Sequence, residues 1–432
     1  MNRLAVSGTV TCVWGAALAA SGAILRPELT GAWLLMLLTS ALVWRVVVYF
    51  DLTPAETVVL LCVFTALFGL SFYNYEAGPL PGAEADARTF YLTASALTWS
   101  EWSFRIGTDA YLGVLGAVLS ATGGSLLAGQ HFSIMIAVFG TASFVAVMRE
   151  LDIERVLWSA GIAVFGLMPS FLFYSMLTLR ESLMLACFVG GAWAAAVSFR
   201  RRSTALLLVA WLLWFGMGTL HQIMLFLLVV LVPASGAAFA MSHAGGRFPR
   251  RALAATAVVA VVAAGLIRYG PVTIQNDYVD DLRRGFAPAV VEYRNAIDRA
   301  HPKTGYGFSV IREPTTEFAK GIARSYYHYL FGPLWRPLRS AADYVLFGEA
   351  VFRALGVVVM AAAALWFGAG RHRLTLLGVL YLTVTMIWSV GTTNHGQAFR
   401  HHMLSNWILV LGSAIAVSAY FVHRRANDAA AR

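Results

Sequence analysis

Residues 392–405 form a short polar segment whose side chains could bind an anion and move a proton. The segment contains His395, Arg400, His401 and His402. Arginine can hold a phosphate through two parallel hydrogen bonds, and histidine can change its charge near neutral pH. A metal ion is the alternative, but no HExxH, DxD or Cys–His spacing is present, and adjacent histidines on a helix point in different directions. We interpret the segment as metal-independent, with His395 and Arg400 binding substrate and His401 as a catalytic candidate.

Arg180 and Glu181 open an apolar stretch and form a second candidate site. An acid in the first turn of a helix is stabilised by the helix dipole, so Glu181 has a structural explanation. A cation is unfavourable at the same place, which favours a phosphate or carboxylate partner for Arg180. The alternative is that Arg180 extends to the lipid headgroups. We retain both residues as substrate-binding candidates.

A third group lies in residues 83–96, AEADARTFYLTASA. Asp86 could act as a general base on a sugar hydroxyl, with Arg88 and Tyr91 as substrate-binding neighbours. The alternative is that Asp86 is a solvated loop carboxylate or a helix N-cap.

Two further places could contribute to substrate binding. His221 follows an apolar stretch at a tight turn, where it is either a polar turn residue or a ligand. Residues 324–339, RSYYHYLFGPLWRPLR, supply Arg324, Trp335 and Arg336. Aromatic and arginine side chains suit a rim that binds sugar and phosphate, and they equally suit an aromatic belt at a membrane interface.

The elements that position these residues are expected to lie in a membrane. Of 432 residues, 59% are hydrophobic and only 12% are charged, with a mean hydropathy of +0.68. This composition excludes a soluble globular enzyme and a disordered or collagen-like chain. The net charge of +10 could indicate nucleic-acid binding, but arginine in cytoplasmic loops explains it in a multispanning protein. No Walker motif or GxGxxG motif supports a nucleotide-driven reaction.

A helix needs roughly 20 apolar residues to cross a bilayer, and the sequence predicts about twelve such spans in a single integral membrane domain, residues 1–432. They are residues 5–25, 31–50, 56–75, 131–148, 156–175, 179–199, 204–220, 222–241, 252–267, 350–369, 374–390 and 405–423.

Arginine placement predicts the orientation of these spans. The clusters at 149–155, 200–202, 247–251, 371–373 and in the C-terminal tail fall on one side if residues 110–128 do not cross the membrane. By the positive-inside rule that side is the cytoplasm, and both termini lie there. We therefore expect residues 110–128 to form a re-entrant or surface-lying helix on the outer side that lines a cavity.

The outer segments are then residues 76–109, 269–349 and 391–404. The second is a large periplasmic loop, too long to be a simple connection. Within it, residues 278–299 and 315–330 are expected to form amphipathic helices at the outer interface.

The order of these motifs resembles that of the Wzy-like and EpsG-like polysaccharide polymerases and related membrane glycosyltransferases with the GT-C fold. The resemblance extends over residues 83–410. The motifs are Asp86 with Tyr91-Leu-Thr-Ala-Ser, Pro169-Ser170 with Arg180-Glu181, Phe331-Gly332-Pro333-Leu334-Trp335, and Asn394-His395-Gly396 with Arg400-His401. In this sequence the acidic residue follows the third span, whereas in many GT-C enzymes it follows the first.

The resemblance implies a GT-C-like fold and glycosyl transfer from a polyprenyl-pyrophosphate-linked sugar or oligosaccharide at the outer face of the bacterial inner membrane. It implies that Arg180 and Arg400 hold the pyrophosphate and that Asp86, or alternatively His401, accepts a proton. Repeat-unit polymerisation is the favoured activity, and a glycan ligase would share the same site.

A transporter or flippase for a lipid-linked sugar is the rival interpretation. Transporters tend to carry internal repeats and polar residues near the bilayer midplane, whereas here no repeat is visible and the polar candidates lie at outer ends of spans. The expected partners are the lipid-linked glycan, the bilayer, and other polysaccharide assembly and export proteins. No cofactor and no nucleic acid are expected.

Overall fold

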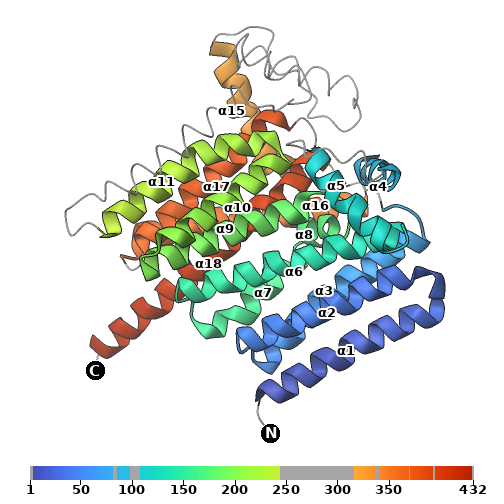
Figure 1. Ribbon diagram of the computed structural model, residues 1–432. Coiled ribbons are helices and arrows are strands. Elements are labelled where there is room, and N and C mark those ends of the chain that lie inside the picture. The colour runs from blue at the N-terminus through green and yellow to red at the C-terminus, as the bar shows by residue number, and fades with distance from the viewer. Residues whose placement is uncertain are drawn as a thin grey trace. The chain divides into compact units, whose positions relative to one another are not determined.

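The computed structural model of the protein describes residues 3–80, 85–97, 108–243, 316–335, 338, 340–368, 370–392 and 395–430. Every regular element in these ranges is a helix (Figure 1). Contacts divide the chain into unit 1, Met1–Leu167 with Phe171–Val272, and unit 2, Met168–Ser170 with Thr273–Arg432. The sequence predicted a single domain, whereas the structure resolves two compact units.

Unit 1 holds the helices of the first half of the chain. They are α1 (Arg3–Leu25), α2 (Thr30–Tyr49), α3 (Pro54–Glu76), α4 (Ala85–Ala96), α5 (Thr108–Ala121), α6 (Leu126–Glu150), α7 (Trp158–Leu167), α9 (Glu181–Arg201), α10 (Thr204–Leu220) and α11 (Leu225–His243). Unit 2 holds α15 (Thr316–Phe331), α16 (Ala341–Trp366), α17 (Arg371–Gly391) and α18 (His395–Ala430). The short helix α8 (Pro169–Ser175) has its first two residues in unit 2 and the others in unit 1.

Seven of the described helices are long and apolar enough to span a membrane. They are Pro27–Tyr49, Pro54–Glu76, Leu126–Glu150, Glu181–Arg201, Ala341–Trp366, Arg371–Val390 and Gly396–Asp428. A bent pair, Arg155–Leu167 and Pro169–Ser175, meets at 57° and makes an eighth if the two form one span. Four shorter apolar helices are Gly8–Ile24, Thr108–Ala121, Thr204–Leu220 and Leu225–Phe239.

Helices occupy each span predicted from the sequence within the described residues, and the span predicted at 252–267 lies outside them. The all-helical class with several helices that could span a membrane is confirmed. The full number of spans stays a prediction.

Local capping chemistry sets where several helices begin. Thr53 precedes α3, where its hydroxyl accepts from the backbone N–H of Glu56 at 3.3 Å and the Glu56 carboxylate accepts from the N–H of Thr53 at 2.8 Å. Pro54 occupies the first helical position, where no N–H donor is needed. Ser340 and Asp343 make the same reciprocal arrangement at the start of α16. These bonds satisfy N–H groups that a helix start otherwise leaves without a partner.

Helix α6 is the centre of unit 1. It packs against α2, α3, α5 and α9. Of its most apolar 18-residue stretch 78% is buried within the protein, compared with 50% for the corresponding stretch of α3. Helix α9 in turn packs against α10, where Trp214 Nε1 donates to the carbonyl of Phe188 at 3.2 Å. Gly191 lies against the Trp214 ring, so the absence of a side chain there allows the two helices to approach closely.

The segment predicted to be re-entrant, residues 110–128, contains a break. Helix α5 is followed by Gly123 and Gly124, whose φ angles of 81° and 77° glycine adopts without steric cost. Ser125 then caps α6 by accepting from the N–H of Ala128 at 3.1 Å. With 14 residues, α5 is about 21 Å long, shorter than the roughly 30 Å hydrocarbon core of a bilayer. That the segment does not cross the membrane stays a prediction.

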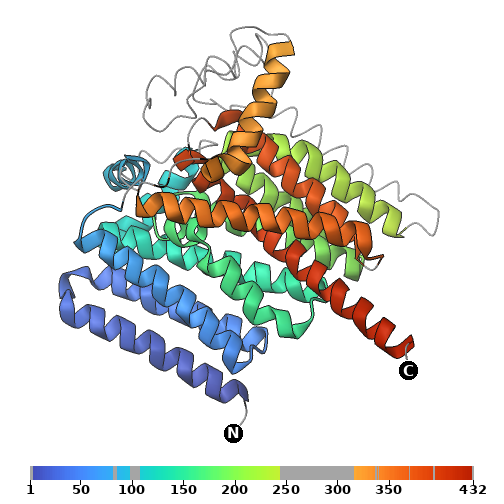
Figure 2. The ribbon, with the colours of Figure 1, turned by 180° about the vertical axis from the view of Figure 1, so that it is seen from behind.

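In unit 2, α18 packs against α16 and α17, and α15 lies against α17 and α16 (Figure 2). Helix α15 matches the amphipathic helix predicted over residues 315–330, whereas the helix predicted over residues 278–299 lies outside the described residues. Ser325 Oγ donates to the carbonyl of Ser389 at 3.2 Å, which ties α15 to the end of α17.

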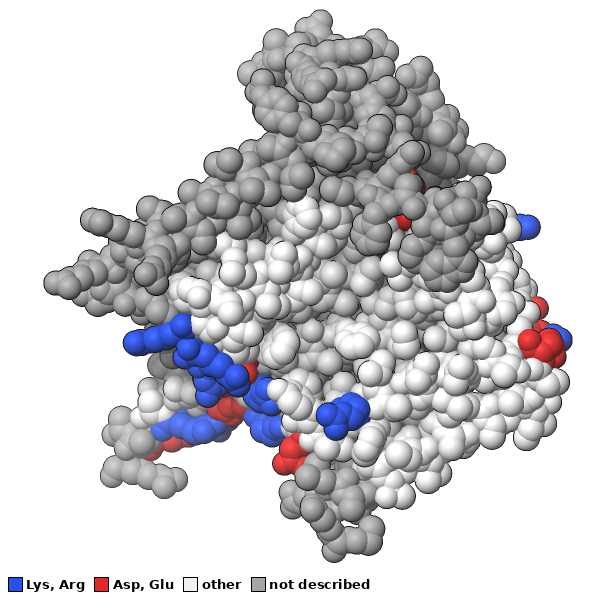
Figure 3. Space-filling model, in the orientation of Figure 1, with Lys and Arg blue, Asp and Glu red and all other residues white. Residues whose placement is uncertain are grey.

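In the space-filling view the charged side chains gather toward the lower left and at the right edge, and the described surface between them is largely uncharged (Figure 3). In unit 1, Glu150 at the end of α6 pairs with Arg200 at 3.3 Å and with Arg149 at 3.8 Å. The structure thus brings together two arginine clusters that the sequence analysis assigned to the same side of the membrane.

A buried carboxylate fixes the loop between α2 and α3. Glu56 is 2% exposed, and Arg155 Nε donates to its Oε1 at 2.8 Å. Arg155 Nη2 also donates to the carbonyl of Asp51 at 2.7 Å, and its guanidinium lies 4.1 Å from the centroid of the Trp158 ring. A buried carboxylate is tolerated only where it is paired and hydrogen-bonded, so Arg155 is a structural residue.

Arg155→Gln is expected to lower the free energy of unfolding by roughly 1–3 kcal/mol, because the buried Glu56 loses its charged donor. The matched control is Arg200→Gln, which removes an ion pair whose arginine is 61% exposed and should cost less than about 1 kcal/mol. Denaturant unfolding of the purified variants in detergent measures the free energy of unfolding of each. Equal stability of the two variants would contradict the structural role of Arg155.

Candidate functional site

Helix α4 contacts the turn that precedes α9, in unit 1. Thr178 Oγ1 donates to the carbonyl of Ala87 at 2.7 Å, and this contact is buried. Arg180 Nη1 donates to Thr108 Oγ1 at the start of α5, at 2.6 Å. The Arg180 guanidinium lies 5.9 Å from the centroid of the Phe90 ring of α4. Two motifs that lie about ninety residues apart in the sequence are therefore neighbours.

Arg180 is the residue immediately before the first turn of α9, and it is half-buried. The unpaired N–H groups and the dipole of a helix N-terminus favour an anion, and arginine adds a planar set of charged donors. Glu181, the first residue of the helix, is 1% exposed and is the acid that the helix dipole stabilises. The site therefore combines one half-exposed cation with one buried acid.

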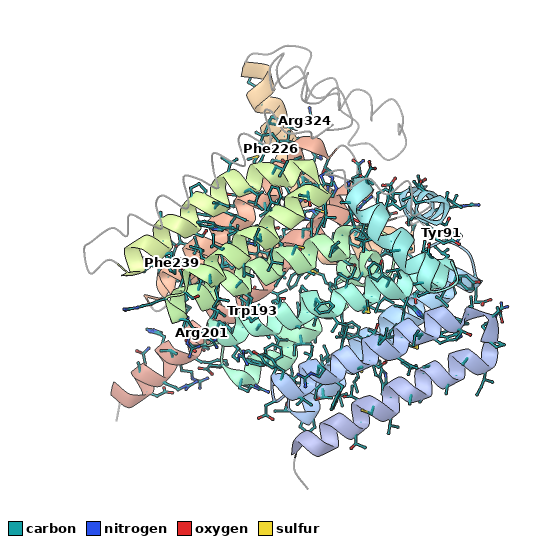
Figure 4. The ribbon with its side chains drawn as sticks, viewed as in Figure 1. Tyr91, Trp193, Arg201, Phe226, Phe239 and Arg324 are labelled. Atoms are coloured by element: carbon teal, nitrogen blue, oxygen red, sulfur yellow. The ribbon has the colours of Figure 1, made fainter. Side chains whose placement is uncertain are left out.

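The other candidates on α4 take different positions. Asp86 lies in the first turn of the helix and is exposed, and Arg88 is exposed as well. The phenol of Tyr91 donates to the carbonyl of Gly124 at 2.7 Å (Figure 4), and burial raises its pKa. Tyr91 thus anchors α4 to the turn between α5 and α6. Asp86 is adjacent to Ala87, whose carbonyl makes the contact with Thr178.

His221 ends α10 and is half-buried. Its N–H donates to the carbonyl of Met217 at 3.3 Å, and its carbonyl accepts from the N–H of Met224 at 2.9 Å. Both contacts belong to the turn between α10 and α11, which fits the interpretation of His221 as a turn residue.

The adjacent histidines of α18 contact different helices of unit 2. His401 Nδ1 lies 2.9 Å from Thr392 Oγ1, and its ring stacks on Trp388 with centroids 3.8 Å apart. Because the Thr392 hydroxyl donates to the carbonyl of Trp388 at 2.7 Å, it accepts from His401, and Nδ1 carries the proton. The buried His402 instead places Nε2 3.0 Å from the carbonyl of Tyr329 on α15.

The remaining sequence candidates lie on the same unit or outside the described residues. Arg400 is half-buried on α18, and Arg324 is exposed on α15. Burial, and secondly the positive charge of Arg324, lower the pKa of His328. The side chains of Trp335, Arg336 and His395 lie outside the described residues. Arg180 belongs to unit 1 and Arg400 to unit 2.

A buried ionic cluster in unit 2 was missed by the sequence analysis. Glu349 of α16 accepts from Arg353 Nη1 at 3.0 Å, from Asn406 Nδ2 at 2.8 Å and from the N–H of Ser170 at 2.8 Å. Asn406 Nδ2 also donates to Ser170 Oγ at 3.0 Å. The side chains of Glu349 and Arg353 are 0% and 3% exposed. Three segments of the chain therefore meet around one carboxylate.

The sequence did contain a signal for this cluster. Arg353 lies inside a span predicted over residues 350–369, and Glu349 precedes it by one helical turn. An ionisable residue inside an apolar spanning helix is a functional hypothesis by default. Ser170 and Asn406 could not have been singled out, because only the tertiary fold brings them to Glu349.

Within the described residues, no group of three or more His, Cys, Asp or Glu side chains is placed to hold a metal ion. Comparisons of the chain with protein-family models, with curated proteins and with solved structures found no match.

Arg353→Met is expected to lower the free energy of unfolding by about 3–5 kcal/mol, because it leaves the Glu349 carboxylate buried without a counter-charge. Glu349→Gln/Arg353→Met should recover part of that loss, since an amide needs no counter-charge and can still accept from the N–H of Ser170. Denaturant unfolding in detergent of both single variants and the double variant measures the coupling. Strict additivity of the two single losses would show that the pair is not coupled.

Proposed function

We propose that the protein transfers a glycosyl group from a polyprenyl-pyrophosphate carrier at the outer face of the bacterial inner membrane, as a polysaccharide repeat-unit polymerase. The observation that carries the proposal is the position of Arg180, a half-buried arginine at the N-terminus of a helix long and apolar enough to span a membrane. About twelve spans, a GT-C-like arrangement and cytoplasmic termini belong to the same proposal.

The surroundings of Arg180 suit a lipid-tethered anion. The Arg180 guanidinium donates to Thr108 Oγ1 and lies 5.9 Å from the centroid of the Phe90 ring, so part of its side-chain freedom is already lost before it binds a phosphate oxygen. The N–H groups of the first turn of α9 add donors to the same anion. The apolar helix below the site would lie beside the prenyl tail, which stays in the bilayer.

The chemistry requires a stabilised leaving group and a proton acceptor. The bond between the anomeric carbon and the pyrophosphate oxygen breaks, and fixed cations stabilise the negative charge that develops on that oxygen. An acceptor hydroxyl attacks the same carbon and loses its proton to a nearby base. Asp86 is the proposed base, because α4 is anchored beside the turn that carries Arg180. Arg400 and His401 are the proposed second cation and alternative base in unit 2.

One observation favours a second candidate function, the transport of a lipid-linked sugar. Polar residues near the middle of spanning helices are typical of transporters, and Glu349 and Arg353 lie buried along α16, with Arg353 halfway through its 26 residues. A transporter would move the lipid-linked sugar between leaflets without forming a glycosidic bond, whereas a polymerase lengthens the glycan.

Arg180→Gln is expected to lower polymer formation in cells by about 100-fold or more, the usual cost of losing one charge-stabilising donor. Single lipid-linked repeat units should still reach the outer leaflet, and the amount of the protein in the membrane should be unchanged. Gel analysis of glycan length measures polymer formation, and an immunoblot measures the amount of the protein in the membrane.

The matched control for this experiment is Arg26→Gln, an arginine in unit 1 that is 44% exposed and paired with Glu76 and Glu28. It should leave polymer length unchanged. Normal long-chain polymer in the Arg180→Gln strain would remove Arg180 from the proposed site. Loss of repeat units from the outer leaflet in that strain would favour the transporter.

A further inference from the structure

Among the described residues of unit 2, the buried polar atoms without a hydrogen-bond partner include four on helices α16, α17 and α18. They are Arg353 Nε, Tyr381 Oη, His402 Nδ1 and Asn406 Oδ1. Each of these residues is at most 2% exposed. A buried donor or acceptor without a partner costs about 1–3 kcal/mol. Four of them in a dry interior would therefore strongly destabilise the folded state of unit 2.

Two of these atoms belong to residues that donate to the Glu349 carboxylate, and the other two lie on helices that pack against α16. Asn406 and Arg353 both donate to the Glu349 carboxylate, and Arg353 lies within electrostatic reach of Tyr381 and His402. Helices α16, α17 and α18, which pack against one another, each supply at least one of the four. The atoms therefore belong to one cluster.

The cluster offers both donors and acceptors. Arg353 Nε is a donor and Asn406 Oδ1 is an acceptor. His402 Nε2 faces the carbonyl of Tyr329, which can only accept, so Nε2 carries the proton and Nδ1 of the neutral ring is an acceptor. Tyr381 Oη can donate or accept. A partner for this set must itself donate and accept.

The charge of the cluster points to a neutral partner. Glu349 and Arg353 offset each other, so the pair has no net charge. An anion would meet the Glu349 carboxylate, and a cation would meet the Arg353 guanidinium, both in a setting where an unmatched charge is costly. A hydroxyl group is neutral, donates and accepts, and fits the set.

We propose that Arg353, Tyr381, His402 and Asn406 form a binding site for neutral hydroxyl groups inside unit 2. Two sources share this chemistry: water, and the hydroxyls of a sugar. The second source rests on the proposed function, whereas the first does not. Water in such a site makes about three hydrogen bonds to buried polar groups that otherwise lack partners.

X-ray radiolysis tests the site, because radicals form from bound water and oxidise the side chains beside it. The full-length protein is placed in lipid nanodiscs in H2 18O, and oxidised residues are read by mass spectrometry. Tyr381 and His402 should be oxidised about ten-fold faster than Phe144 and Phe188, which are equally buried but have no polar atoms to hold water.

Two variants refine the test. Tyr381→Phe removes one member of the cluster and should reduce oxidation of His402. Tyr111→Phe removes an equally buried phenol from unit 1 and should leave oxidation of His402 unchanged.

Adding the lipid-linked repeat unit purified from host membranes separates the two sources. Protection of Tyr381 and His402 supports a site that takes sugar hydroxyls, and unchanged oxidation supports a site that takes water alone. Oxidation of both residues no faster than that of Phe144 in the unmodified protein would overturn the proposal. The oxidation measured without added repeat unit requires no glycosyl transfer. Its result therefore does not depend on the proposed function.

Discussion

A polar group buried among apolar helices must find a hydrogen-bond partner in the protein or in a bound molecule, and the rest of this structure depends on that constraint. Glu56 meets it through Arg155, and Glu349 meets it through Arg353, Asn406 and Ser170. The contacts of Glu56 with Arg155, and of Glu349 with Asn406 and Ser170, join segments that lie far apart in the chain. Packing of apolar residues brings the helices together, and the few buried polar contacts determine which helix faces meet.

The same constraint gives the candidate site in unit 1 its geometry. Helix α4 packs against α5, and it is anchored by the hydrogen bonds from Thr178 to Ala87 and from Tyr91 to Gly124. Those anchors bring the segment of Asp86 beside the turn of Arg180. An anion bound there would receive donors from a side chain and from a helix N-terminus that are already oriented, which is how fixed charges assist the departure of a phosphate leaving group.

The sequence predicted the helical class well, because runs of apolar residues directly report burial in lipid or protein. It also predicted the amphipathic helix α15, whereas the single helix predicted over residues 110–128 is interrupted at Gly123 and Gly124. It could not predict that α4 contacts the start of α9, since that contact depends on tertiary packing. Glu349 and Arg353 were not singled out from the sequence. A search for apolar runs averages over about twenty positions, so two charged residues do not prevent a run from being assigned as a span. Ser170 and Asn406 are ordinary residue types whose importance lies in their partners.

Reconstitution is the measurement that tests the central claim most directly. The purified protein is placed in liposomes with a polyprenyl-pyrophosphate-linked repeat unit, and the products are separated by glycan length. The account predicts lipid-linked glycans of two or more repeat units together with released polyprenyl pyrophosphate. Repeat units that stay single, whether they remain in their leaflet or cross to the other one, would contradict it.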